Sequence, residues 1–431
     1  MDNRIALCTE LENEISKQGY SLSRFSQISG INRGILSATL NGNPPKPMSI
    51  NQLDTMTTAL GKPEGWLYER FAEQCFDEQG KTNWRRVRAL LLRCIELNRN
   101  VLIERILCLL LEDISYLNQV FELAEELIAD NPSESVMQLY ECVVSNERNY
   151  QAERLAISHY RIFRYAIKRD IKQNFIAAVT FQPFCERLPQ DIQLDAWLNL
   201  SNIYYAVQEW KLVNNCGNQL ISITENIYSQ QKHKDITSER PFVKYVGQAY
   251  LCKAIFHQKN GNYDKAIIYT QKYSDLEWLS DLEVEDKKEI EKFKIFAKGN
   301  LYGIELYRGN FNVLKEYAKF LEVHPHETMA GLLNILTTAN QYNVCIDYVL
   351  KKFRPFILKN LYNDTYIKRF IVDNQYTNLC YQLALYQSKR SNHSKDLKST
   401  LLLFEKAVQK CNISLTLDYT SLLQNVIRSM P

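Results

Sequence analysis

The sequence predicts an all-α protein. Gly and Pro are scarce, at 14 and 11 of 431 residues, and such scarcity disfavours the many tight turns of a β architecture. Apolar residues recur at helical rather than alternating spacing along most of the chain. Tyr is abundant, with 26 residues, and large amphipathic rings fill the wedges between packed helices. These features predict long helices that pack against one another in more than one domain.

The composition is typical of a globular protein in water, with 45% hydrophobic residues, 23% charged residues and a net charge of +3. The richest apolar run, residues 103–111, contains Glu104 and Arg105 and is too short to cross a bilayer. Charged residues near the start interrupt any apolar core of a signal peptide. The 11 cysteines form no C-x-x-C pair, which fits reduced thiols. We therefore expect a cytoplasmic protein that does not contact the membrane.

The helical pattern divides the chain into a first domain at residues 1–70, a junction at 71–83 and a long helical domain at 84–431. In the first domain, apolar residues from Ile5 to Tyr20 predict an opening helix, and residues 48–60 predict a closing one. Between them lies the most informative stretch of the chain, residues 21–42.

Residues 21–42 predict two short helices joined by a sharp turn. Ser21 and Asn32 are suited to cap the two helices, and Gly30 stands where the backbone must turn with positive φ. The inward side chains are expected to be Leu22, Phe25, Ile28, Ile35, Leu36 and Leu40. The outward residues of the second helix are small or polar, as a helix lying against the base edges of DNA requires.

This pattern resembles the Xre class of helix-turn-helix domains found in phage repressors, over about residues 1–66. The resemblance implies that the base edges are faced by Asn32, Arg33, Gly34, Ser37 and Ala38. It places near the phosphates Ser21, Ser23, Asn41, Asn43 and Lys46. Of the base-facing residues, Arg33 alone can form a bidentate pair with guanine.

Two departures from the pattern bear on this prediction. Gly34 is unusual inside a recognition helix, where it costs roughly 1 kcal/mol relative to Ala. Residues 1–70 contain seven basic and seven acidic residues, so the domain is neutral and a single copy should bind DNA weakly. A dimer that presents two domains to two half-sites would compensate, and the alternative is a small helical domain used for protein contacts.

The long helical domain contains recurring breaks in which an aromatic residue follows a turn. These aromatics are Tyr150, Trp210, Tyr263, Phe311 and Tyr342. The helix at 196–205 carries Trp197, Leu200, Ser201 and Tyr204 at the spacing of a tetratricopeptide repeat. The domain therefore resembles degenerate repeats of this class, which stack into a right-handed α-solenoid with a concave face. The polar stretch 230–241 is expected to be an extended loop.

A concave face suits an elongated ligand such as a peptide. Placing the sequence on the repeat template brings to that face Asn199, Asn202, Tyr205, Gln248, Asn300 and Asn334. Asn and Gln side chains both donate and accept hydrogen bonds, so they can hold a peptide backbone whatever its side chains. The alternative for each is an ordinary solvated polar residue.

An Xre-type domain followed by tetratricopeptide-like repeats resembles the RRNPP family of peptide-responsive quorum-sensing regulators. The resemblance implies a cytoplasmic homodimer that binds a double-stranded, palindromic operator. It also implies that a short linear signalling peptide in the concave face controls operator binding or transcriptional output. No cofactor is implied.

Enzymatic motifs are not evident in the sequence, which contains no P-loop, no dinucleotide fingerprint and no G-x-S-x-G. The pair His324 and His326 lies in an expected loop without clustered thiols or carboxylates, so we expect no metal site and no catalytic residues.

Two other functions remain open. The chain could be a constitutive repressor whose solenoid serves only dimerisation or the docking of protein partners. It could also be an inhibitor of an enzyme, with a vestigial DNA-binding domain.

The roles of two segments also remain open. The basic run 84–88 with Arg93 could contact DNA phosphates or an acidic partner surface, or be a solvated helix face. Residues 401–427 could cap the solenoid or join subunits.

Overall fold

The structure is a computed structural model that describes most of the chain. The described residues are 3–42, 45–76, 82–129, 132–168, 170–233, 235–280, 282–362, 370–390 and 400. They are predominantly helical and form no β-strand, apart from one isolated bridge between Phe76 and Thr82. The predicted all-α class is therefore confirmed. Asn43 and residues 401–427, both subjects of sequence predictions, lie outside the described residues.

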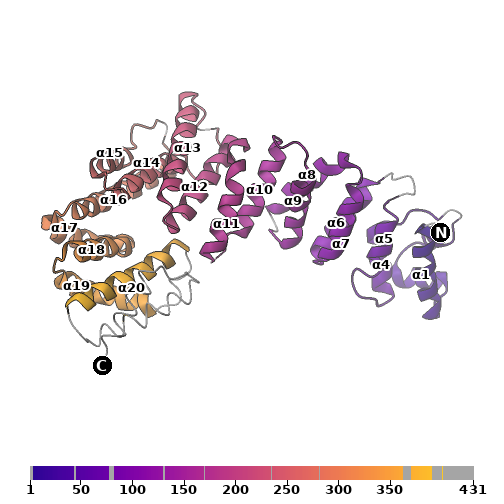
Figure 1. The fold of residues 1–431 in the computed structure, drawn as a ribbon. Coiled ribbons are helices and arrows are strands. Elements are labelled where there is room, and N and C mark those ends of the chain that lie inside the picture. The colour runs from indigo at the N-terminus through magenta and orange to yellow at the C-terminus, as the bar shows by residue number, and fades with distance from the viewer. Residues whose placement is uncertain are drawn as a thin grey trace. The chain divides into compact units, whose positions relative to one another are not determined.

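The chain divides into two compact units, Met1–Tyr165 and Ala166–Pro431 (Figure 1). The first unit contains α1 (Asn3–Lys17), α2 (Leu22–Ser29), α3 (Arg33–Leu40), α4 (Ile50–Ala59), α5 (Tyr68–Glu73), α6 (Trp84–Glu96), α7 (Asn100–Leu110), α8 (Leu117–Ile128), α9 (Glu134–Asn146) and α10 (Glu153–Ala166), whose last residue crosses the boundary.

Helices α2 and α3 begin and end where the sequence predicts, whereas α1 ends three residues before Tyr20 and α4 begins two residues after Met48. Ser21 caps α2 by accepting a hydrogen bond from the Arg24 backbone N–H at 3.3 Å. Gly30 ends α2 in the left-handed region with φ of 69°, which a residue without Cβ adopts at little cost. Asn32 then caps α3, because its Oδ1 accepts from the Gly34 N–H at 2.8 Å. Ser49 and Gln52 form a reciprocal capping box at the start of α4.

The hydrophobic core of the first unit runs without interruption through the predicted junction at 71–83. Leu7 of α1, Phe25 of α2 and Leu53 of α4 belong to the same cluster of buried side chains as Phe71 of α5 and Leu90 of α6. Helices α4 and α5 both pack against α6. The first helices of the predicted repeat domain therefore share a core with the predicted first domain.

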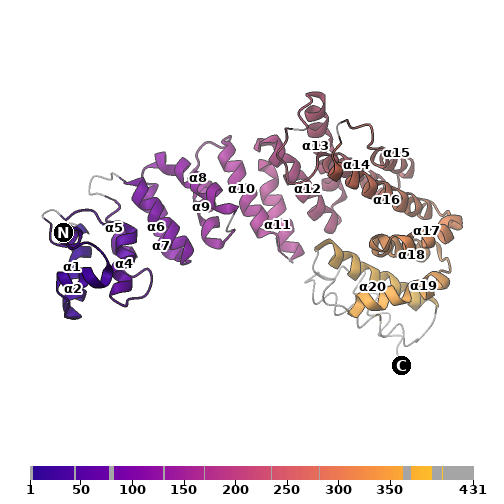
Figure 2. The same cartoon turned by 180° about the vertical axis from the view of Figure 1, so that it is seen from behind.

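The second unit contains α11 (Ile171–Phe181), α12 (Gln190–Ala206), α13 (Trp210–Ser229), α14 (Phe242–Lys259), α15 (Tyr263–Ser274), α16 (Val284–Tyr307), α17 (Leu314–Val323), α18 (Thr328–Tyr342), α19 (Asp347–Tyr362) and α20 (Phe370–Arg390). From α12 to α16 each helix packs against the next (Figure 2). The expected loop at 230–241 is present between α13 and α14.

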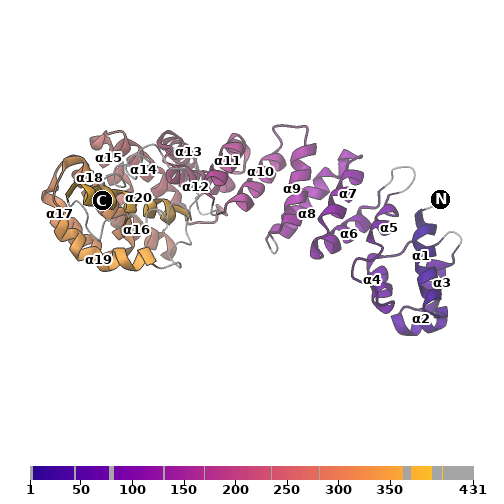
Figure 3. The ribbon, with the colours of Figure 1, turned by 60° about the horizontal axis from the view of Figure 1, so that its bottom comes forward.

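Helix α20 returns toward the start of the second unit. It packs along α18 and also contacts α12, more than 160 residues earlier in the chain. Figure 3 shows α20, coloured gold, beside α18 and near α12. The helices from α12 to α20 therefore do not form an open row, because α20 lies against both α18 and α12.

Some sequence predictions about the turns are wrong. Tyr342 is the last residue of α18 rather than a residue following a turn, and its hydroxyl donates to the Tyr307 carbonyl at 2.7 Å. Trp210 and Tyr263, by contrast, do follow turns and begin α13 and α15. The histidine pair lies between α17 and α18: His324 follows the last residue of α17, and His326 lies in a single turn of 3₁₀ helix at Pro325–Glu327.

Close packing of α14 against α16 gives a test of the second unit. A Cβ at Gly247 would lie 2.3 Å from the ring of Phe293, which is fully buried. Ala is favoured over Gly by about 1 kcal/mol in an exposed helix, so any loss of stability reports the clash. We expect Gly247→Ala to lower the free energy of unfolding by about 1–3 kcal/mol, measured by urea unfolding.

The matched control is the same substitution in a Phe293→Leu background, where the ring is gone. There the cost of Gly247→Ala should shrink by about 1 kcal/mol or more. An equal cost in both backgrounds would mean that α14 and α16 do not meet at this point.

Candidate functional site

The first candidate site is the outer surface of α2 and α3. Asn32, Arg33, Gly34 and Ser37 are exposed, and Ala38 is half-buried. The predicted phosphate-contacting residues Ser21, Ser23, Asn41 and Lys46 are also exposed. The described residues that were predicted to face bases or phosphates are therefore accessible to solvent, wholly or in part, and all lie within residues 21–46.

Two apolar residues depart from the prediction. Ile28 and Ile35 were expected to face inward, yet they are 40% and 47% exposed. The core positions of α3 are instead Leu36, Thr39 and Leu40, since an eight-residue helix can direct only one narrow side to the core. Ile35 therefore joins Arg33 on the accessible surface, where a methyl-bearing side chain suits contact with thymine.

Gly34 has a local structural reason. A Cβ at this position would lie 3.1 Å from Oδ1 of Asn32, the atom that caps α3. This is a tight approach to a side-chain atom, which a larger residue would have to displace by a few tenths of an ångström. The glycine therefore leaves the capping contact unstrained.

The neutral charge of the first 70 residues is unevenly distributed. Residues 21–47 contain Arg24, Arg33 and Lys46 and no acidic residue. Elsewhere in the domain, two of the acidic residues form ion pairs, Glu14 with Lys62 at 2.7 Å and Glu10 with Arg70 at 3.1 Å. The surface of α2 and α3 is therefore locally basic, which favours a polyanion over an acidic partner.

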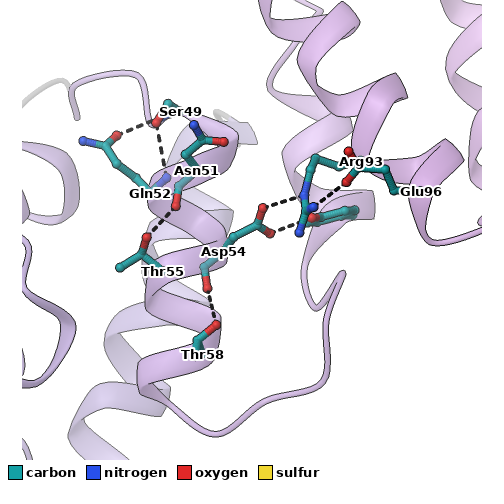
Figure 4. Close-up of polar contacts among 9 residues, drawn as sticks. Ser49, Asn51, Gln52, Asp54, Thr55, Thr58, Arg93 and Glu96 are labelled. Atoms are coloured by element: carbon teal, nitrogen blue, oxygen red, sulfur yellow. Dashed lines mark hydrogen bonds and ion pairs between the residues drawn. The ribbon is translucent and has the colours of Figure 1, made fainter. Parts of the chain in front are cut away.

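A polar network ties α4 to α6 (Figure 4). Arg93 Nε donates to Asp54 Oδ2 at 3.0 Å, and the same guanidinium also donates to Glu96. Tyr68 donates its hydroxyl proton to the other Asp54 oxygen at 2.5 Å. Burial, followed by the hydrogen bond to Asp54, raises the pKa of Tyr68 well above its ordinary value. Asp54 therefore accepts from two elements and fixes α4 against the first helix of the predicted repeats.

The basic run 84–88 is mostly occupied by internal contacts. Arg86 donates to the carbonyls of Gln74 at 3.0 Å and Met48 at 3.1 Å, and its guanidinium lies over the ring of Phe71. Arg88 pairs with Glu126 at 2.7 Å. Arg86 therefore ties α6 to the segments around α4 and α5, which neither interpretation of the run predicted, whereas the exposed Arg88 pair fits a solvated helix face. Arg85 remains exposed.

The second candidate site is a cavity of about 1160 Å³ inside the second unit. This volume exceeds the roughly 300–1,000 Å³ of typical small-molecule pockets. Helices α11, α12, α13, α14, α16, α18 and α20 supply its walls. Nine of its 26 lining residues are Asn or Gln, and aliphatic side chains such as Leu251, Ile255 and Leu333 lie among them. A lining that mixes amides with apolar patches suits a peptide, which presents both kinds of surface.

Five of the six residues predicted to bind a peptide line this cavity, namely Asn202, Tyr205, Gln248, Asn300 and Asn334. Gln248 donates to Ser201 Oγ at 3.4 Å and Asn300 donates to the Tyr273 hydroxyl at 2.7 Å. The sixth, Asn199, is not a lining residue. Its amide donates to the Asp195 carbonyl on its own helix at 2.7 Å. The predicted pairing of Asn199 with Asn202 on one face is therefore wrong.

Sequence reasoning missed the wall formed by α20. Gln375, Asn378 and Gln382 all line the cavity, together with Tyr381. Their spacing of three and four residues is a polar stripe on one helix side, a signal that the sequence does contain. It could not show that this stripe faces the opposite wall. Lys172 and Lys259 also line the cavity and were not predicted to do so.

Other kinds of site find no support in the described part of the chain. It holds no cluster of three or more His, Cys, Asp or Glu side chains that could bind a metal ion. No helix within it is long and apolar enough to cross a bilayer.

No protein-family model matches the chain, and a search of curated proteins finds no significant relative.

The Asp54 network gives a test of the link between α4 and α6. Asp54→Asn removes the charge that Arg93 faces and weakens hydrogen bonds to a charged group. We expect the backbone amides of α4 and α6 to exchange about tenfold faster in native-state hydrogen exchange.

Asp264→Asn is the matched control, because it removes an ion pair with Arg308 in which the Asp264 side chain is 87% exposed. Such a pair contributes less than about 1 kcal/mol, so exchange should barely change. Protection of α4 and α6 that survives Asp54→Asn would show that the apolar core alone joins these helices.

Proposed function

We propose that the protein is a cytoplasmic DNA-binding transcriptional regulator whose operator binding or output is controlled by a short peptide bound in the cavity of the second unit. The observation that supports this proposal most is that one chain contains both an exposed, basic pair of helices, α2 and α3, and a cavity lined by amide side chains. The proposal includes membership of the RRNPP family, homodimers and a palindromic operator.

DNA binding is supported by the local geometry of α2 and α3. The Gly30 turn, the Asn32 cap and the exposed side of α3 are the features of a helix-turn-helix. Arg33 is exposed and forms no hydrogen bond or ion pair with another described residue. A guanidinium left unpaired on a recognition helix is available for a guanine edge, and two copies in a dimer would read two half-sites.

Peptide binding is supported by the chemistry and size of the cavity. The rows of packed helices from α12 to α18 are consistent with tetratricopeptide-like repeats in a right-handed solenoid, with α20 lying across their inner side. A constitutive repressor with a solenoid used only for docking would need its inner face filled by apolar partner helices. The cavity is instead lined by nine Asn or Gln side chains, which favours the ligand-controlled function.

Control follows from differential affinity. A peptide held between α12, α14, α18 and α20 contacts both ends of the row, so it favours the arrangement of helices that fits it best. At saturating peptide, the equilibrium constant between the two arrangements changes by the ratio of the peptide's affinities for them. The Asp54 network would transmit such a shift within the first unit, since it joins α4 to α6.

Removing the base-reading side chain tests DNA binding. Arg33→Ala should lower affinity for the selected operator by about tenfold or more, because a bidentate arginine–guanine pair contributes about 1–3 kcal/mol. Operators are first selected from random DNA with the wild-type protein, and affinity is then measured by fluorescence polarisation. Arg148→Ala, at another exposed arginine of the first unit, should bind like wild type. Selection that returns no defined sequence would contradict the proposal.

Two asparagines on one helix test the peptide response. Asn202 lines the cavity and forms no hydrogen bond with another described side chain, whereas Asn199 lies outside it. Asn202→Ala should weaken the change in operator affinity caused by peptides from spent culture medium, with basal DNA binding unchanged. Asn199→Ala should respond like wild type. Equal responses of the two variants would place the peptide elsewhere.

A further inference from the structure

The charged residues that line the cavity are all cationic. Lys172 and Lys259 contribute side chains to the lining, and no Asp, Glu or His is among the 26 lining residues. The other lining residues are neutral. The ionisable side chains of the lining therefore include two cations and no carboxylate.

Lys259 stands where several helix ends meet. It is the last residue of α14, and its ammonium lies 5.4 Å from the ring centre of Trp210 and 5.5 Å from that of Tyr307. Trp210 begins α13 and Tyr307 ends α16. Tyr205 of α12 packs edge-on against Trp210 with ring centres 5.8 Å apart. The ammonium is thus bordered by aromatic faces.

No carboxylate among the described residues forms an ion pair with Lys259. The side chain is open to solvent from the cavity, yet protein atoms surround it on most sides. This partial desolvation lowers the pKa of Lys259 below its ordinary value, and Tyr205 opposes the change only in part. An ammonium in such a place gains much from an anion, since the attraction is less screened than in bulk water.

We propose that the ligand of this cavity carries a carboxylate that binds the Lys259 ammonium between Trp210 and Tyr307. This inference rests on the proposed peptide-binding function and specifies its ligand. The amides of Asn202 and Gln248 would hold the peptide backbone, and the lysine would set its direction by binding either the terminal carboxylate or an acidic side chain. A charge-assisted hydrogen bond of this kind is about twice as strong as a neutral one.

Three synthetic hexapeptide libraries test the proposal on the purified full-length protein. All share a random core without Asp or Glu. The first ends in an amide, the second has a free terminal carboxylate, and the third ends in an amide but contains one Asp or Glu. Retained peptides are identified by affinity selection and mass spectrometry. We expect at least one carboxylate-bearing library to be retained about tenfold or more above the first, and the better arm identifies the source of the carboxylate.

Variants then assign the preference to one residue. Lys259→Met and Lys259→Gln should abolish the preference, and a thermal melt of each variant checks that the chain still folds after losing the contacts of the ammonium with Trp210 and Tyr307. Lys298→Met is the control, since Lys298 is an exposed lysine over the ring of Phe320, at 5.9 Å, and does not line the cavity. It should keep the full preference.

The outcomes separate this inference from the proposed function. Equal retention of all three libraries would overturn the carboxylate proposal and leave peptide binding standing. A preference that persists in both Lys259 variants would likewise overturn the role of Lys259. If no library is retained, the result would contradict the proposed peptide binding, and the carboxylate proposal, which rests on it, would be contradicted as well.

Discussion

The return of α20 onto α12 is the constraint on which the second unit depends. Gln375 of α20 donates to the Tyr205 hydroxyl at 3.4 Å, across 170 residues of sequence, and Asn340 of α18 donates to the Gln382 carbonyl at 2.8 Å. These contacts, with the packing of α18 on α20, bring α20 into the wall of the cavity that α12, α14 and α16 also line. They join the two ends of the helix row on which the cavity depends.

A cavity lined by amides has a physical consequence. Partly buried donors and acceptors are costly when they lack partners, so they bind water or a ligand with matching groups. A peptide backbone supplies donors and acceptors along its whole length. Under the proposed function, a peptide whose partners come from α12, α14, α18 and α20 would also stabilise the arrangement in which these helices surround it. Ligand recognition and conformational control would then be properties of the same surface.

Much of this could be predicted from the sequence because the signals are local. Gly30, Asn32 and Ser49 determine where helices begin and end through contacts within a few residues, and five of the six predicted peptide-facing residues reached one cavity through helical periodicity. Closure by α20 could not be predicted, since it depends on a contact between distant segments. The internal contacts of Arg86 and Arg93 were missed for the same reason, because their partners lie on α4 and on the segment around α5. Ile35 was predicted to face inward with Leu36, because the helical period of a short helix does not show which of two adjacent apolar residues is buried.

The most direct test of peptide-controlled DNA binding is genome-wide occupancy of the tagged protein in its own cells, with and without spent medium from a dense culture of the same strain. A ligand-controlled regulator should occupy discrete palindromic sites whose occupancy or transcriptional output changes with the medium. Discrete sites at which neither changes would contradict control by a secreted peptide and favour a constitutive repressor. The absence of any discrete site would contradict DNA binding itself.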